Sequence, residues 1–93
     1  MKYDIKMSSV FKKELRSVKK QGKDLSLLDE IVTLLAEGET LPEKNHDHEL
    51  SGNWKGHREC HIQPDWLLIY KITDRELILT LVRTGSHSSL FGK

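Results

Sequence analysis

Six residues in the carboxyl-terminal part of the sequence could together carry out acid–base chemistry on a phosphate. They are His61, Asp65 and Trp66, which lie around the start of one apolar run, and Arg83, His87 and Phe91, which lie around the end of a second. Imidazole exchanges protons near neutral pH, a guanidinium pairs with phosphate oxygens, and aromatic rings stack on nucleobases. The combination therefore favours acid–base cleavage of a phosphodiester, as in a small ribonuclease.

The two apolar runs predict the strands that must position these residues. Residues 66–73 and 76–84 are apolar on both faces, which is typical of central strands. Residues 73–75 predict a hairpin turn between them, and Gly85 ends the second run. Residues 55–62 alternate between polar and apolar side chains, which predicts a third strand beside them.

The amino-terminal residues predict a short strand followed by an amphipathic helix. Residues 2–7 alternate loosely between polar and apolar side chains. Ser8 or Ser9 can then cap a helix whose inward-facing residues recur at helical spacing over residues 10–18. Gly22 is expected to end this helix.

A second helix is predicted to open at Asp24 or Ser26 and to stop at Gly38. Ser26 and Asp29 resemble a capping box. Residues 39–54 are rich in polar residues and predict a loop. The elements follow the order β-α-α-β-β-β, so we expect an α+β fold in which two amino-terminal helices pack on a small, mostly antiparallel sheet.

Length and cysteine content limit the class of protein. Ninety-three residues suffice for one domain with one core, so residues 1–93 are expected to form a single domain. Cys60 is the one cysteine, which excludes an internal disulfide and fits a reducing compartment. The sequence contains no apolar window long enough to span a membrane and does not open with a signal peptide. A cytoplasmic protein without a membrane partner is expected.

The charges are unevenly distributed although the net charge is only +1. Residues 1–23 hold eight basic and two acidic residues (+6), residues 24–49 one basic and eight acidic (−7), and residues 50–93 six basic and four acidic (+2). The basic amino-terminal part could contact a polyanion, or it could be only the solvated face of a helix.

The order of elements and three blocks of residues resemble the RelE/ParE superfamily of bacterial toxins, most closely its YafQ-like mRNA interferase branch. The blocks are Asp47-His48-x-Leu50-x-Gly52-x-Trp54-Lys55-Gly56-x-Arg58, His61-x-x-Pro64-Asp65-Trp66, and Arg83-Thr84-Gly85-x-His87-x-x-Leu90-Phe91-Gly92. The resemblance implies a RelE-like microbial ribonuclease fold and metal-independent cleavage of messenger RNA, typically in the ribosomal A site. It also implies a cognate antitoxin that silences the toxin and mediates any contact with operator DNA.

The same resemblance assigns roles to individual residues. The catalytic roles fall on His48, His61, Asp65, Arg83 and His87, and Trp66 and Phe91 shape the site around the substrate. His87 is the expected general acid and His48 the expected base, while Asp65 can orient an imidazole. Lys55 is expected to contact the RNA backbone. No cofactor is expected.

An alternative to the catalytic role of His48 is a metal site that His46 and His48 would form in the polar loop. Zinc needs further ligands, and Cys60 and His61 are the available ones. Adjacent side chains in a strand point to opposite faces, so Cys60 and His61 cannot bind one ion together. No metal ligand set is therefore expected.

Two other functions remain open. A ParE-like topoisomerase poison would share the fold, but that branch lacks a histidine-rich site, so His48, His61 and His87 together argue against it. A non-catalytic interaction or DNA-binding subunit would use the basic helix as its working surface.

Overall fold

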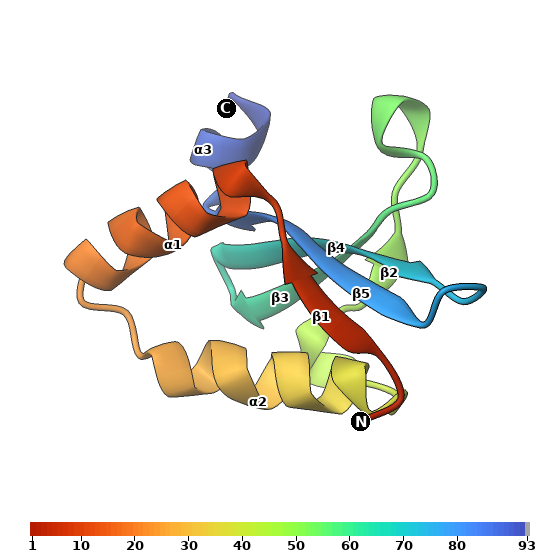
Figure 1. The fold of residues 1–93 in the computed structure, drawn as a ribbon. Coiled ribbons are helices and arrows are strands. Elements are labelled where there is room, and N and C mark those ends of the chain that lie inside the picture. Colours follow the sequence, from red (N-terminus) through yellow and green to blue (C-terminus); the bar gives the residue numbers. More distant parts are fainter. Residues whose placement is uncertain (93) are drawn as a thin grey trace.

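The computed structural model describes residues 1–92, and these form one five-stranded sheet with three α-helices (Figure 1). The strands are β1 (Asp4–Met7), β2 (His48–Glu49), β3 (Arg58–Gln63), β4 (Trp66–Thr73) and β5 (Ile78–Gly85). The α-helices are α1 (Ser9–Lys20), α2 (Leu25–Ala36) and α3 (His87–Phe91), and 3₁₀ turns span Glu43–Asn45 and Gly52–Trp54. The sheet order is β1-β5-β4-β3-β2, with β1 parallel to β5 and the other neighbours antiparallel. The predicted α+β class is confirmed.

Two local predictions need correction, and one helix was not predicted. The segment 39–54, predicted as a loop, contains the two-residue strand β2 and both 3₁₀ turns, which are too short to impose a hydrophobic period. Asp24, rather than a box formed by Ser26 and Asp29, caps α2 by accepting a hydrogen bond from the backbone N–H of Ser26 at 3.0 Å. The segment after Gly85 forms the short helix α3.

The main core lies between the sheet and helices α1 and α2. Phe11 and Val18 of α1 pack with apolar residues of α2, and alternate residues of the strands meet them. The strand residues are Cys60 and Ile62 of β3, Trp66, Leu68 and Tyr70 of β4, and Leu79 and Leu81 of β5. Each fully buried large side chain contributes about 1.5–3 kcal/mol, so this layer supplies most of the driving force for folding.

A second, smaller apolar cluster covers the opposite face of the sheet. Leu67 and Ile69 of β4 contact Leu90 of α3, and Leu50, Trp54 and Val82 pack around them. Figure 1 shows α2 below the sheet and α3 above it. Strand β4 therefore buries both faces, as its continuous apolar sequence predicted.

The end of β5 departs from a regular strand at two points. The register shifts so that Tyr70 pairs with Leu81 and Ile69 with Arg83, which leaves Val82 as a bulge and takes Arg83 out of phase with Leu81. Gly85 has φ +154°, and a Cβ atom added there would collide with Ser89 Oγ of α3. Glycine at this position thus allows the chain to turn directly from β5 into α3.

No helix within residues 1–92 is long and apolar enough to cross a membrane.

Cys60 should resist alkylation in the folded protein. Its side chain is fully buried, and burial raises the pKa of its thiol to about 12, so almost no reactive thiolate forms near neutral pH. We expect iodoacetamide to leave the native chain unmodified and to modify it fully in guanidinium chloride, as measured by mass spectrometry. Rapid alkylation of the native protein would contradict the burial of Cys60.

Candidate active site

Two polar side chains of β3 lie on the sheet face opposite α1 and α2. Glu59 pairs with Ile69 of β4 and His61 pairs with Leu67, so both share the face of the smaller apolar cluster. Glu59 is nevertheless buried, with 5% of its surface exposed. A buried carboxylate is stable only when charged or hydrogen-bonding groups lie against it.

Strand β2 brings His48 to the same place. His48 pairs directly with Glu59 across the β2–β3 ladder, so their side chains share a face. The preceding residue, Asp47, accepts hydrogen bonds from Tyr70 Oη at 2.6 Å and from Arg58 Nε at 3.3 Å. Tyr70 belongs to the main core on the helix side, and neighbouring side chains along a strand alternate. Anchoring Asp47 on one face therefore directs His48 to the other.

Glu59 lies between two imidazole rings. Its Oε1 atom is 3.5 Å from Nε2 of His48 and 3.8 Å from Nε2 of His61. The carbonyl oxygen of His46 lies 2.7 Å from Nδ1 of His48, and because a carbonyl only accepts, this nitrogen carries a hydrogen. The contact between Glu59 and Nε2 of His48 is then attractive only when a proton lies between the two atoms. Glu59 is thus placed to stabilise an imidazolium.

His87 and Asp65 form a second pair of imidazole and carboxylate. Nδ1 of His87 lies 2.9 Å from Oδ1 of Asp65, and the backbone N–H of His87 donates to the same oxygen at 3.1 Å. The hydrogen bond from the ring, followed by that from the backbone, holds the pKa of Asp65 below its ordinary value. An ionised carboxylate only accepts, so Nδ1 of His87 carries the hydrogen. Its Nε2 is left for proton transfer.

Four aromatic rings follow one another along the edge of this cluster. Ring centroids are 5.4 Å apart for His46 and His61, 5.7 Å for His61 and His87, and 6.4 Å for His87 and Phe91. Beside His46 and His61 lies a hollow of about 430 Å³, which Lys44, Asn45, Ile62, Gln63 and Pro64 also line. Its volume lies in the range of small-molecule sites, and a nucleobase would fit.

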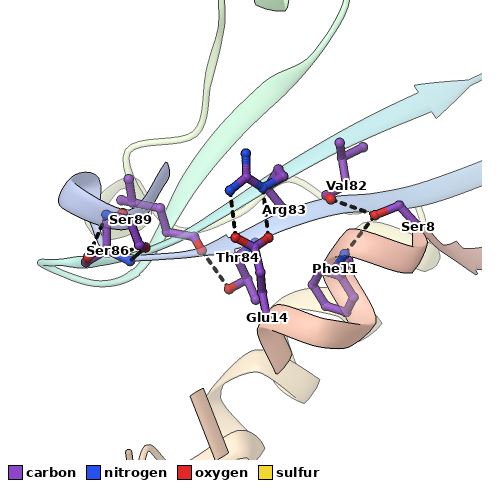
Figure 2. Close-up of polar contacts among 9 residues, drawn as sticks. Ser8, Phe11, Glu14, Val82, Arg83, Thr84, Ser86 and Ser89 are labelled. Atoms are coloured by element: carbon purple, nitrogen blue, oxygen red, sulfur yellow. Dashed lines mark hydrogen bonds and ion pairs between the residues drawn. The ribbon is translucent and has the colours of Figure 1, made fainter. Parts of the chain in front are cut away.

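Arg83 is held by helix α1. Its Nε donates to Glu14 Oε1 at 2.9 Å and its Nη2 donates to Oε2 at 2.7 Å (Figure 2). Hydrogen bonding to Glu14 raises the pKa of Arg83 above its ordinary value, so the guanidinium remains charged. In the sheet, Arg83 and Glu59 both pair with Ile69, which places their Cα atoms about 10 Å apart, or two strand spacings. Arg83 is therefore a fixed cation on the far side of β4 from the imidazoles.

Two predicted substrate contacts lie away from the imidazoles. Trp66 is fully buried and donates from Nε1 to Thr84 Oγ1 at 3.0 Å, so neither face of its ring can stack on a base. Its predicted role is corrected: the ring supports β4 from within the main core. Lys55 is exposed but lines a hollow with Ile72 and Asp74, toward the opposite end of β4 from Asp65.

Comparison with known proteins identifies the family. Residues 3–92 match the family described as the bacterial toxin of type II toxin-antitoxin system, YafQ. The chain belongs to the YafQ family. A relative in Escherichia coli (strain K12), named mRNA interferase toxin YafQ, is 43% identical over 90 residues, which make up 96% of each chain.

Solved structures of relatives share the fold over nearly the whole chain. The crystal structure of the E. coli DinJ-YafQ complex contains a chain 43% identical to this one, with a TM-score of 0.89, covering 97% of this chain and 99% of that chain. The crystal structure of a metal-bound toxin from Helicobacter pylori is 47% identical, with a TM-score of 0.91, over 96% and 99% of the two chains. The resemblance to YafQ-like toxins that the sequence predicted is confirmed.

Three side chains of this YafQ-family site could hold a metal ion. Glu59, His61 and His87 each place one ligand atom within 4.8 Å of the others. Imidazole and carboxylate ligands suit zinc or copper. The sequence predicted no ligand set, because Cys60 and His61 point to opposite faces of β3. Glu59, which shares the face of His61, supplies the ligand that this reasoning left out.

Sequence reasoning missed three residues around the site. Glu59 lies two positions before His61, and this spacing on one strand face could have shown that they lie together. Glu14 occupies an inward position of α1, where a carboxylate needs a cation. His46 has φ +46°, and no sequence signal distinguishes it from an ordinary loop histidine.

The ring of His87 should occupy the Nδ1–H tautomer whenever it is neutral, because Asp65 accepts from that nitrogen. We expect long-range ¹H–¹⁵N spectra to show this tautomer in the parent. Asp65→Asn should preserve it, since the carboxamide oxygen still accepts, whereas Asp65→Ala should release the ring to a mixture. An Nε2–H tautomer in the parent would refute this hydrogen bond.

Proposed function

We propose that this YafQ-family toxin is an endoribonuclease that cleaves messenger RNA without a metal, in the ribosomal A site. The 2′-hydroxyl of the substrate attacks the adjacent phosphorus while the bond from phosphorus to the 5′-oxygen breaks. The products are a 2′,3′-cyclic phosphate and a 5′-hydroxyl. A base must remove the 2′ proton, an acid must protonate the departing oxygen, and a cation must balance the phosphorane charge.

His87 is the proposed acid. Asp65 fixes its ring through Nδ1, which leaves Nε2 directed away from that carboxylate and free to carry the transferable proton. The ring remains half exposed, with 51% of its side chain accessible, so a phosphodiester can reach it. His87 lies at the start of α3, with its ring 5.7 Å from that of His61, and this position at the edge of the imidazole cluster supports the proposed role.

His48 is the proposed base, and Glu59 supports it. The nitrogen of His48 that can accept a proton is Nε2, because Nδ1 is committed to the carbonyl of His46. Once Nε2 takes the 2′ proton, the new charge lies 3.5 Å from the carboxylate of Glu59, which stabilises it. His61 lies between the base and the acid, 5.7 Å from the ring of His87, where it can bind the phosphate or share the proton.

Arg83 supplies the proposed cation, and Phe91 the proposed stacking surface. Glu14 engages Nε and one hydrogen of Nη2, so Nη1 and the second hydrogen of Nη2 are the donors that would bind the phosphorane oxygens. Phe91 keeps 36% of its surface exposed beside His87, so its ring is available to a base. Lys55 is too far along the sheet to touch the same phosphate and is proposed to contact the RNA backbone further on.

The observation that carries this proposal is the geometry of two imidazole–carboxylate pairs on neighbouring elements. His48 with Glu59 and His87 with Asp65 are separate pairs, and the ring of His61 lies near both. One pair can hold a proton and release it while the other accepts one. The E. coli relative named an mRNA interferase toxin, 43% identical over almost the whole chain, supports the same substrate class.

A cognate antitoxin is the proposed protein partner. The E. coli relative was crystallised as the DinJ-YafQ toxin-antitoxin complex, and the same fold covers nearly all of this chain. Exposed lysines and Arg16 on α1 offer a basic surface to such a partner or to RNA. Arg58 is less available to either, because Asp47 and Glu49 pair with it. Since the proposed substrate is messenger RNA on the ribosome, the proposed location of the activity is the cytoplasm.

Cleavage should persist in excess chelator and leave a 2′,3′-cyclic phosphate or 3′-phosphate end. The histidines can catalyse the transesterification without a metal. A metal ion bound to Glu59, His61 and His87 would occupy ring nitrogens that are needed for proton transfer. We therefore expect added zinc to slow cleavage of a translated message, with ends mapped by primer extension and by phosphatase sensitivity. Loss of activity in EDTA that zinc restores, or 3′-hydroxyl products, would overturn the mechanism.

His87→Ala should slow cleavage by about 10²–10⁴-fold, the usual contribution of one general acid or base. The fold should survive, because the ring lies at the surface of α3. Ser88→Ala is the matched control, since Ser88 is the exposed neighbour in the same helix. Single-turnover cleavage and thermal melting of both variants provide the measurement, and a His87→Ala rate within about threefold of the control would remove His87 from the acid role.

A further inference from the structure

The outer edge of β5 is covered by two different elements. Strand β1 pairs with β5 only as far as Met7 and Leu81, and the chain then turns into α1. Beyond that point, the backbone N–H of Ser8 donates to the carbonyl of Leu81 at 3.0 Å, and Ser8 Oγ donates to the carbonyl of Val82 at 2.7 Å. Helix α1 thus takes over the backbone partners that a longer β1 would have supplied.

Glu14 completes this edge and reaches the last residues of β5. Its Oε1 accepts from Thr84 N at 3.2 Å and from Arg83 Nε at 2.9 Å, while Oε2 accepts from Arg83 Nη2 at 2.7 Å (Figure 2). The side chain of Glu14 is 17% exposed and that of Arg83 is 25% exposed. The carboxylate therefore has three donors in a largely buried position.

Glu14 is a charged residue on the buried face of α1. It lies three residues after Phe11 and four before Val18, both of which are buried in the main core. An apolar residue would fit this stripe, and a partly buried carboxylate is unfavourable without a paired cation. The carboxylate at this position is therefore explained by its pairing with Arg83 and not by packing in the core.

The pair leaves one side of the guanidinium available. Glu14 engages Nε and Nη2, and within residues 1–92 no hydrogen bond engages Nη1. Two parallel hydrogen bonds fix the plane of the guanidinium as well as its position. Thr84 N donates to the same carboxylate at 3.2 Å, so Glu14 has a second support besides Arg83.

We propose that Glu14 is a positioning residue for catalysis: it fixes Arg83 so that Nη1 and the remaining Nη2 hydrogen face the phosphate being cleaved. This role rests on the proposed function, in which Arg83 binds that phosphate. Glu14 itself touches no substrate. Its contribution is to restrict Arg83 to one orientation before RNA binds, and such restriction raises the rate at the chemical step rather than the affinity.

A double-mutant cycle tests this role. The variants are Glu14→Gln, Arg83→Ala and the pair combined, with Glu30→Gln, an exposed glutamate of α2, as the control. Glutamine keeps an oxygen that can accept from Thr84 N, so the end of β5 retains its support while the charge-assisted fork is lost. Cleavage rates at saturating and subsaturating substrate would be measured with melting temperatures for every variant.

We expect Glu14→Gln to lower the cleavage rate at saturating substrate about ten- to hundredfold. The substrate concentration that gives half of the maximal rate should stay within about twofold of the parent value. In the Arg83→Ala background, the same change should have no further effect on rate. Because Arg83→Ala leaves the Glu14 carboxylate largely buried without its cation, Glu14→Gln should raise the melting temperature in that background rather than lower it. Glu30→Gln should match the parent.

Three results would overturn the role of Glu14 while leaving the proposed nuclease intact. A faster Glu14→Gln enzyme would show that the carboxylate competes with the phosphate for Arg83. An equal loss in both backgrounds would show that Glu14 acts through the fold alone. An Arg83→Ala enzyme as active as the parent would show that Arg83 is not needed for cleavage, so that orienting it cannot be the role of Glu14. A parent that does not cleave RNA would overturn the proposed function and this role with it.

Discussion

Strand β4 is buried on both faces, and this constraint decides where polar chemistry can occur in the molecule. From Trp66 to Tyr70 no side chain is more than 1% exposed, so no charged group fits in the centre of the sheet. The polar residues collect instead where β3 ends, where β4 begins and where β5 turns into α3. The imidazole cluster is thus built around the rim of an apolar strand pair, which keeps its backbone rigid and its side chains accessible.

Paired charges recur wherever a carboxylate enters the folded interior. Asp47 holds Arg58 and Tyr70, Glu14 holds Arg83, and Glu59 faces two imidazoles. Removing one member of such a pair leaves the other buried without compensation, which is usually more destabilising than replacing both. Asp47 joins Arg58 and Tyr70, 11 and 23 residues away, and Glu14 joins Arg83, 69 residues away, so these contacts fix geometry as well as charge.

The sequence was informative where the signal is local and uninformative where it depends on long-range contact. The apolar run of residues 66–73 predicted a central strand, and Asp65 after Pro64 was correctly suspected of approaching an imidazole. Glu14 lies 69 residues from Arg83, and no periodicity reveals such a pairing. His48 was assigned to a loop because a two-residue strand has no pattern, although its ladder contact with Glu59 places it in the site. Trp66 was predicted to contact the substrate, but its ring is buried in the main core. The sequence cannot distinguish the two, because an aromatic residue at a strand end can either pack in the core or bind a ligand.

Helix α3 is too short to be stable on its own, so the site can be disrupted while the rest of the fold stays intact. It spans five residues, capped by reciprocal hydrogen bonds between Ser86 and Ser89 and anchored to the sheet through Leu90. Strands β4 and β5 rest on a much larger apolar layer. Opening of α3 alone, which carries His87 away from Asp65, therefore requires less free energy than global unfolding. Amide protons of residues 87–91 would exchange with solvent well before those of β4, and mild denaturant would silence the protein while its sheet remained formed.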